Sequence, residues 1–253
     1  MSVLLLFNLA THGRMSLVSA TGIVGGIKEY TFRGIQQLPI ILGSTSLLFT
    51  IATGSVAHAN IVLGMGVVMP LYTYGLHIIL SYLLEKFAAK YKTSWTRSTG
   101  PPCNILITND TKLVSNDANA QAVPSYWLME VAFFIGYAMT NAVDSLLTPA
   151  QPNSNPENVE KRNTHATFVI IALAIFSILL LAVRFTVMRG CEGQGVLGLG
   201  LSIASAVGAA GIGYWMYQFS RNCGSRASDL FGILSQILPL SSTSPHPIVC
   251  AAD

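Results

Sequence analysis

The stretch YWLMEVAFFIGYAMTNAVDSLL, residues 126–147, decides how the rest of the chain can fold. It is long and apolar enough to cross a bilayer as an α-helix, which needs about 20 such residues. Its polar residues Glu130, Tyr137, Asn141 and Asp144 recur at intervals of seven, four and three positions. At about 3.6 residues per turn they fall on one stripe of the helix. A spanning helix turns such a stripe away from lipid, so the pattern predicts that other helices surround this one.

The composition is typical of a membrane protein. Of 253 residues, 51% are hydrophobic and 10% are charged, whereas soluble domains contain about 25% charged residues. The net charge of +3 is small and scattered along the chain, so we expect no nucleic-acid partner. The lipid bilayer is the first partner that the composition predicts.

Long apolar stretches predict an all-α, polytopic integral membrane protein with about five transmembrane helices. We expect an interfacial or re-entrant N-terminal segment at residues 1–34, a transmembrane helical bundle at 35–219 and a C-terminal docking tail at 220–253. A polar loop at 91–125 interrupts the bundle. Whether residues 1–27 span, lie at the interface or form a loosely packed terminal helix stays open. The five expected spans cover residues 37–59, 61–84, 126–147, 167–188 and 194–219.

The distribution of lysine and arginine predicts an orientation. Basic residues are more frequent on the side that holds the N-terminal segment, the polar loop and Arg184–Arg189, and the positive-inside rule assigns that side to the cytosol. Arg184 is expected to extend its side chain to the interface. The glycosylation sequon Asn109-Asp110-Thr111 lies on the same side, where it would stay unused.

The four cysteines divide between the two sides of the membrane. Cys103 and Cys191 fall on the cytosol-like side. Cys223 and Cys250 fall on the other side and can form a disulfide if that side is oxidising. Two free thiols are the alternative reading of this second pair.

Small residues repeat every four positions along the last expected span. One series contains Gly200, Ala204 and Gly208, and a second contains Ser205, Ala209 and Gly213. This spacing lets helix backbones approach closely. We therefore predict that both series pack against neighbouring helices.

No pattern predicts catalysis, a metal ion or a cofactor. The sequence has no H-E-x-x-H or G-x-S-x-G motif, and its five histidines are scattered, without the spacing of metal ligands. The glycine run at residues 195–200 is not a phosphate loop, because no Lys-Ser or Lys-Thr follows it. We expect a non-enzymatic protein.

Two functions are compatible with the polar stripe at residues 126–147. In the first, the stripe is a packing seam, with Glu130 near the headgroups and Asp144 at the opposite mouth. In the second, it is part of a small ion or solute transporter or channel, with Tyr137 and Asn141 as relays. The seam is favoured because both acidic residues lie near a helix end, where charge costs less.

The C-terminal tail contains apolar side chains that need a surface to cover them. They are Phe231, Ile233, Leu234 and Ile237. The tail is too short to fold alone. We therefore predict that it docks on a neighbouring protein.

Several short motifs in the C-terminal half carry a resemblance to known proteins. They are Val123-Pro124-Ser125-Tyr126-Trp127, Arg221-Asn222-Cys223-Gly224-Ser225-Arg226, Asp229-Leu230-Phe231-Gly232-Ile233 and Ser235-Gln236-Ile237-Leu238-Pro239. Together they resemble multi-span membrane proteins of large icosahedral double-stranded DNA viruses, which lie in the internal membrane beneath the capsid. The resemblance implies a structural component of the virion membrane that contacts minor capsid proteins through its loops and tail. It implies no catalytic residues.

Overall fold

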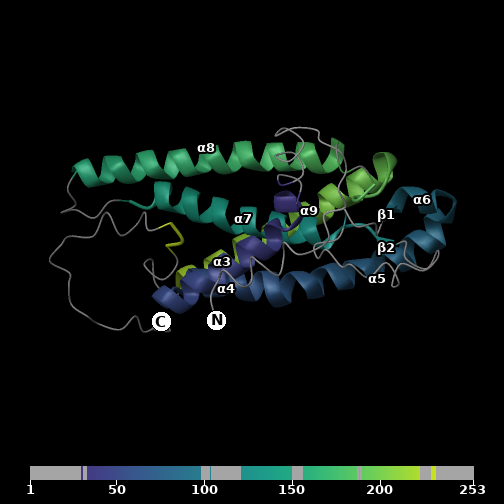
Figure 1. Ribbon diagram of the computed structural model, residues 1–253, viewed down its shortest axis with the longest axis horizontal. Helices are drawn as coiled ribbons and strands as arrows, with labels where there is room; N and C mark the ends of the chain where they lie inside the picture. The colour runs from purple at the N-terminus through teal and green to yellow at the C-terminus, as the bar shows by residue number, and fades with distance from the viewer. Residues whose placement is uncertain are drawn as a thin grey trace, which may run out of the picture.

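The computed structural model describes residues 30, 33–97, 103, 121–149, 156–186, 188, 190–222 and 229–231. These residues are mostly helical, and the long helices run along the long axis of the molecule (Figure 1). The all-α fold class is therefore confirmed for this part of the chain. In chain order the elements are α3 (Leu38–Thr53), α4 (Val56–Leu63), the π-helical turn η1 (Gly64–Val68), α5 (Met69–Ala88), the 3-10 turn η2 (Ala89–Tyr91), α6 (Lys92–Trp95), β1 (Thr96–Arg97), β2 (Gln121–Ala122), α7 (Tyr126–Leu147), α8 (Pro156–Thr186) and α9 (Gly195–Asn222).

Helix α7 is the central helix of the bundle. It packs against α8 and α9 and also contacts α3 and α5, and in Figure 1 it lies between α8 and the pair α3 and α5. Ser125 caps its first turn by accepting a hydrogen bond from the Leu128 N–H at 3.1 Å. The prediction that other helices surround this stretch is confirmed.

Three helical segments are long and apolar enough to cross a membrane. They are the continuous segment Val56–Trp95, which comprises α4 to α6, and the helices α8 and α9. Helix α3 has 16 residues and is about 24 Å long, shorter than the roughly 30 Å of bilayer hydrocarbon. Helix α7 is not among the three, and its polar stripe lowers its mean hydropathy. Membrane crossing by α3 and α7 therefore stays a prediction.

Two boundaries differ from those expected. The first turn between spans falls at Gly54, not near residue 60, because Gly54 adopts a φ of +66° and its N–H bonds to the Thr50 carbonyl. Glycine ends helices readily in this left-handed conformation. Helix α8 begins at Pro156, about three turns before residue 167, and its first turns carry the exposed Glu157–Lys161 ion pair.

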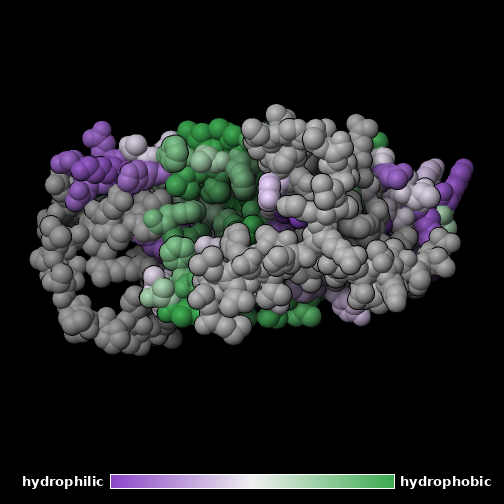
Figure 2. All heavy atoms as spheres, in the orientation of Figure 1, coloured by the Kyte–Doolittle hydropathy of each residue, from purple (hydrophilic) through white to green (hydrophobic). Residues whose placement is uncertain are grey.

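Large apolar side chains are exposed along the outer faces of the long helices. On α8 they include Phe168, Ile171, Ile175 and Ile178, with 53–71% of each residue exposed. Figure 2 shows hydrophobic residues gathered toward the middle of the long axis and hydrophilic residues toward both ends. Such an apolar surface is expected where the outer faces of the helices contact the acyl chains of a membrane.

The second small-residue series forms the contact between α7 and α9. A Cβ on Gly213 would lie 2.4 Å from the Phe133 carbonyl oxygen, and one on Gly136 would lie 2.3 Å from that of Ala210. Ser205 and Ala209 are buried with Gly213.

The first small-residue series does not pack as expected. Gly200 and Ala204 are exposed, and no described atom lies near a Cβ added at Gly200. Gly208 contacts a neighbour, because a Cβ there would lie 2.3 Å from the Tyr72 hydroxyl. The four-residue repeats therefore mark two faces of α9 that carry small side chains. Helix α7 covers the face with Gly213, and among the described residues α5 contacts the other face only at Gly208.

Candidate functional site

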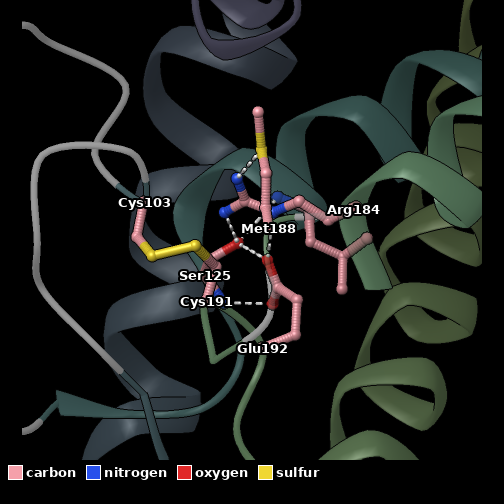
Figure 3. Close-up of a disulfide and its surroundings, with 7 residues drawn as sticks. Cys103, Ser125, Arg184, Met188, Cys191 and Glu192 are labelled. Carbon is pink, nitrogen blue, oxygen red and sulfur yellow. Dashed lines mark hydrogen bonds and ion pairs between the residues drawn. A yellow bond between two sulfur atoms is a disulfide. The ribbon is translucent and has the colours of Figure 1, made fainter. Parts of the chain in front are cut away.

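A buried ion pair joins the last turns of α8 to the turn that precedes α9. The Arg184 Nε lies 2.8 Å from the Glu192 Oε1, and their side chains are 0% and 2% exposed. Figure 3 shows both side chains pointing toward Ser125 beside a disulfide. A charge buried this deeply is stable when it is paired and hydrogen-bonded.

Ser125 connects this ion pair to the first turn of α7. Its hydroxyl donates to the Glu192 Oε1, and its backbone N–H donates to the Glu192 Oε2 at 3.1 Å. The Arg184 Nη2 lies 3.3 Å from the same hydroxyl. One carboxylate therefore fixes the ends of three helices, because Ser125 also caps α7.

Two further side chains enclose the Arg184 guanidinium. Its Cζ lies 4.7 Å from the centre of the Trp127 ring, a distance typical of cation–π contacts. Its Nη1 lies 3.4 Å from the Met188 Sδ. The Trp127 Nε1 donates to the Ile35 carbonyl at 2.7 Å, which ties the cluster to the segment before α3.

The turn at residues 190–194 places Glu192 by its backbone. The Ser202 hydroxyl donates to the Glu192 carbonyl at 3.0 Å, and the Gln194 N–H donates to the Ser94 carbonyl at 2.9 Å. Gly193 has a φ of +82°, and a Cβ there would lie 2.7 Å from the Ser94 carbonyl oxygen. A side chain at this position would separate the turn from α6.

A disulfide between Cys103 and Cys191 closes the same end of the bundle. Both cysteines are buried, at 4% and 1% exposed, and Met188 packs beside them. The disulfide joins the polar loop to the turn before α9 (Figure 3). We call the cluster of Cys103, Ser125, Arg184, Cys191 and Glu192 the disulfide end.

Arg97 is a third charged residue near this cluster. It is 6% exposed and interacts electrostatically with Glu192 and Arg184. Burial lowers the pKa of the Arg97 guanidinium, and the nearby Glu192 carboxylate opposes that change. Arg97 therefore belongs to the same buried charged cluster as Arg184 and Glu192.

Sequence reasoning missed most of the disulfide end. Arg184 was expected to reach the interface, but it is buried, because Glu192 supplies a partner eight residues later. Glu192 was not singled out. One signal in the sequence could have indicated the disulfide: Cys103 and Cys191 were expected on the same side of the membrane, where they can pair.

The disulfide favours an orientation opposite to the one expected from the basic residues. Disulfides form and persist in oxidising compartments, whereas the count of lysine and arginine assigned Cys103 and Cys191 to the cytosol-like side. Cys223 and Cys250 lie outside the described residues, so their pairing stays a prediction.

The predicted polar stripe lies mainly at the opposite end of the bundle. The Asp144 Oδ1 lies 2.8 Å from the Arg221 Nη1, and its Oδ2 accepts a hydrogen bond from the Tyr217 hydroxyl at 2.7 Å. Tyr137 and Asn141 are both 0% exposed. We call this group, together with Tyr217 and Arg221, the Asp144 end. It joins α7 to α9.

A few polar side chains extend the Asp144 end toward α4. The Asn60 Nδ2 donates to the Met216 carbonyl at 3.3 Å. The hydroxyls of Tyr137 and Ser220 are buried, and the Tyr137 hydroxyl faces the side chains of Ser220 and Asn60. The middle of the stripe, Tyr137 and Asn141, therefore lies inside the bundle.

Glu130 differs from the other residues of the stripe. It is partly buried in the second turn of α7. Within the part of the chain that the structure describes, no hydrogen bond or ion pair involves its carboxylate. Among the described residues, Asp144 therefore has an ion-pair and a hydrogen-bond partner, and Glu130 has neither.

The remaining predicted site residues lie in the tail. Phe231 is 40% exposed, and its neighbour Leu230 packs against the core cluster of the bundle. Ile233, Leu234 and Ile237 lie outside the described residues. No group of three metal-ligating side chains occurs in the described part of the chain.

These contacts define the chain as a helical bundle with three helices able to cross a membrane and a polar cluster at each end. Comparisons with protein-family models, with curated proteins and with solved structures found no match.

Proposed function

We propose that this chain is a non-enzymatic structural membrane protein that docks neighbouring proteins through its loops and tail. One observation carries the proposal: charged groups join helix ends to one another at both ends of the bundle. Glu192 joins α7, α8 and the turn before α9, and Asp144 joins α7 to α9. Such pairs fix the relative positions of helices, and their charged groups are engaged with each other.

The start of the tail supports the docking role. Leu230 packs against the bundle, while Phe231 remains 40% exposed beside it. The chain that follows therefore leaves from a fixed point on the bundle. This arrangement suits a segment that is held at one end and binds a partner along the rest.

A truncation tests the docking role without disturbing the bundle. Deleting residues 232–253 keeps Leu230 and also Arg221, whose guanidinium pairs with Asp144. We expect normal membrane insertion and loss of partner binding, measured by crosslinking mass spectrometry in the native membrane. Unchanged crosslinks to neighbouring proteins would remove the docking role from the tail.

The proposed setting is the internal membrane of a large icosahedral double-stranded DNA virus, with minor capsid proteins as partners. This setting rests on the resemblance of the short C-terminal motifs. Crosslinking of purified virions is the test, and we expect crosslinks between residues 232–253 and a capsid protein. Absence of the chain from virions would contradict the setting and leave the scaffold role intact.

Transport of a small ion or solute is the second candidate function. Two observations favour it: no described residue pairs with the Glu130 carboxylate, and the Tyr137 hydroxyl is buried in the bundle. Flux into liposomes should then fall in Glu130→Gln and in Asp144→Asn. No flux from the unmodified protein would exclude this function.

A further inference from the structure

One face of α5 changes in composition along the helix. On this face exposed side chains recur in neighbouring pairs every four residues, a spacing that keeps them on one side of an α-helix. The pairs are Ile78 and Ile79, Tyr82 and Leu83, Lys86 and Phe87 and, beyond the end of α5, Lys90 and Tyr91. The face therefore passes from aliphatic residues through tyrosine to lysine and further aromatic residues.

The aliphatic part of this face is placed to contact the acyl chains of a membrane. Helix α5 belongs to the segment Val56–Trp95, which is long and apolar enough to cross a bilayer. No Asp, Glu, Lys or Arg occurs from residue 61 to residue 84. A helix of this length extends about 36 Å, slightly more than the roughly 30 Å of bilayer hydrocarbon. Residues after 84 therefore lie at the level of the headgroups.

Charged residues begin where this apolar stretch ends. Glu85, Lys86, Lys90 and Lys92 are exposed, and three lysines with one glutamate give a net charge of +2. The ion pairs within the described part of the chain join other side chains, so none of the three ammonium groups there is paired with a carboxylate. Ammonium groups of this kind bind phosphate.

Aromatic side chains alternate with the lysines. Phe87 is 78% exposed, and the Lys86 Nζ lies 5.8 Å from the centre of its ring. Tyrosine is enriched where acyl chains give way to headgroups, and lysine near a helix end extends its ammonium group to the same level. We call the six exposed basic and aromatic side chains the basic aromatic surface; they are Tyr82, Lys86, Phe87, Lys90, Tyr91 and Lys92.

A bend of the backbone holds this surface at the disulfide end. Ala88 leaves the helical conformation, with a φ of −134° and a ψ of 30°, and the chain continues through η2 into α6, as Figure 1 shows. The Trp95 Nε1 donates to the Ala88 carbonyl at 3.3 Å. Trp95 is buried, while Lys90 and Tyr91 stay exposed. The bend therefore turns α6 inward and leaves the lysines outside.

We propose that the basic aromatic surface binds the headgroups of anionic phospholipids at the disulfide end of the bundle. The lipid phosphates lie beside the three ammonium groups, and the rings pack among the first methylene groups of the acyl chains. The site rests on the membrane location of the chain and is independent of the docking role of the tail.

Photocrosslinking identifies the lipids that lie against this surface. A benzophenone amino acid replaces Phe87, and the full chain is reconstituted in nanodiscs with equal parts of phosphatidylcholine and phosphatidylglycerol. Both leaflets then have the same composition, so the result does not depend on the orientation of the chain. Mass spectrometry of the peptide crosslinked at position 87 counts each captured lipid. The same amino acid in place of Phe176 is the matched control, because Phe176 is exposed in the apolar middle of α8.

We expect capture at position 87 to favour phosphatidylglycerol about fivefold relative to position 176, the factor that one lysine contributes near an anionic surface. Changing the three lysines together to glutamine should remove this preference, and changing them to arginine should keep it, because arginine retains the charge. Lys161→Gln removes an exposed charge at the other end of the bundle and should change nothing. Formation of the Cys103–Cys191 disulfide checks the fold of each variant.

Three results would overturn the proposal. The first is the same lipid ratio at positions 87 and 176 when all three lysines are present. The second is capture of a protein segment at position 87, which would assign the surface to another part of this chain or to a second copy of it. The third is an equal loss of preference in the glutamine and arginine variants, which would show that positive charge does not select the lipid.

Discussion

The Glu192 carboxylate accepts hydrogen bonds from both the backbone N–H and the hydroxyl of Ser125, 67 residues earlier in the chain. Ser125 caps α7, and Glu192 pairs with Arg184 near the end of α8. The contact between these two residues therefore holds the start of the central helix against the turn that begins α9. It depends on charge that is shielded from both lipid and water.

Removing either charge of this pair should destabilise the bundle. We expect Arg184→Gln or Glu192→Gln to lower the free energy of unfolding by about 3–5 kcal/mol, because each leaves an unpaired buried charge. Chemical denaturation in detergent measures the change. The double variant Arg184→Met with Glu192→Leu should recover much of the loss.

The exposed Glu157–Lys161 pair serves as the control for this experiment. Its side chains are 68% and 59% exposed, so Lys161→Ala should leave stability unchanged. Equal losses for Lys161→Ala and Arg184→Gln would contradict the role given to the buried pair.

The disulfide should contribute strongly to stability. It joins cysteines separated by 88 positions, and closing a loop of this length stabilises a fold by roughly 4–5 kcal/mol. We expect reduction, or Cys191→Ser, to lower the thermal unfolding temperature. Peptide mapping without reductant should recover a fragment that links Cys103 to Cys191, and its absence would show that the pair is not formed in the native protein.

The orientation of the chain can be tested at its glycosylation sequon. Asn109 lies outside the described residues, six positions after Cys103 in the polar loop. If the disulfide end faces an oxidising lumen, translation with microsomes should attach a glycan to Asn109. Asn109→Gln should abolish the resulting mass increase. If Asn109 stays unmodified and protease added to the cytosolic side digests the polar loop at residues 91–125, the orientation predicted from the basic residues is correct.

The close approach of α7 and α9 predicts different effects at two glycines of one helix. Gly213→Ala should destabilise the bundle by about 1–3 kcal/mol, because its Cβ would meet the backbone of α7 and overpacking has costs of this size. Gly211→Ala is the matched control, since nothing lies within 4 Å of a Cβ there. It should be neutral or slightly stabilising, because alanine favours helix. Equal effects would mean that the two helices are further apart than the structure places them.

The central helix and its polar stripe could be predicted because both depend on local spacing. A stripe repeating near 3.6 residues specifies which face of residues 126–147 is buried, and Tyr137, Asn141 and Asp144 lie accordingly. The stripe does not specify the partners. Tyr217 and Arg221 come from a helix about 75 residues later, and no local pattern connects them with Asp144.

The disulfide end could not be predicted because its contacts join distant segments. Arg184 alone in an apolar stretch is compatible with an interfacial position, and only Glu192, Ser125 and Trp127 together make burial favourable. The small-residue repeats show the same limit. They marked Gly200 and Gly213 alike, but α7 covers Gly213 and leaves Gly200 exposed.

One measurement tests most directly whether α7 is a packing core inside a lipid-facing bundle. The variants Ile178→Cys and Asn141→Cys are each reconstituted in liposomes. The reactivity of each introduced thiol is measured with a spin-label reagent and with a water-soluble thiol reagent. We predict that a spin label attached at Ile178→Cys collides with oxygen dissolved in the membrane. We predict that the Asn141→Cys thiol reacts neither with the spin label nor with the water-soluble reagent. Rapid reaction of the Asn141→Cys thiol with the water-soluble reagent, at unchanged stability, would contradict it.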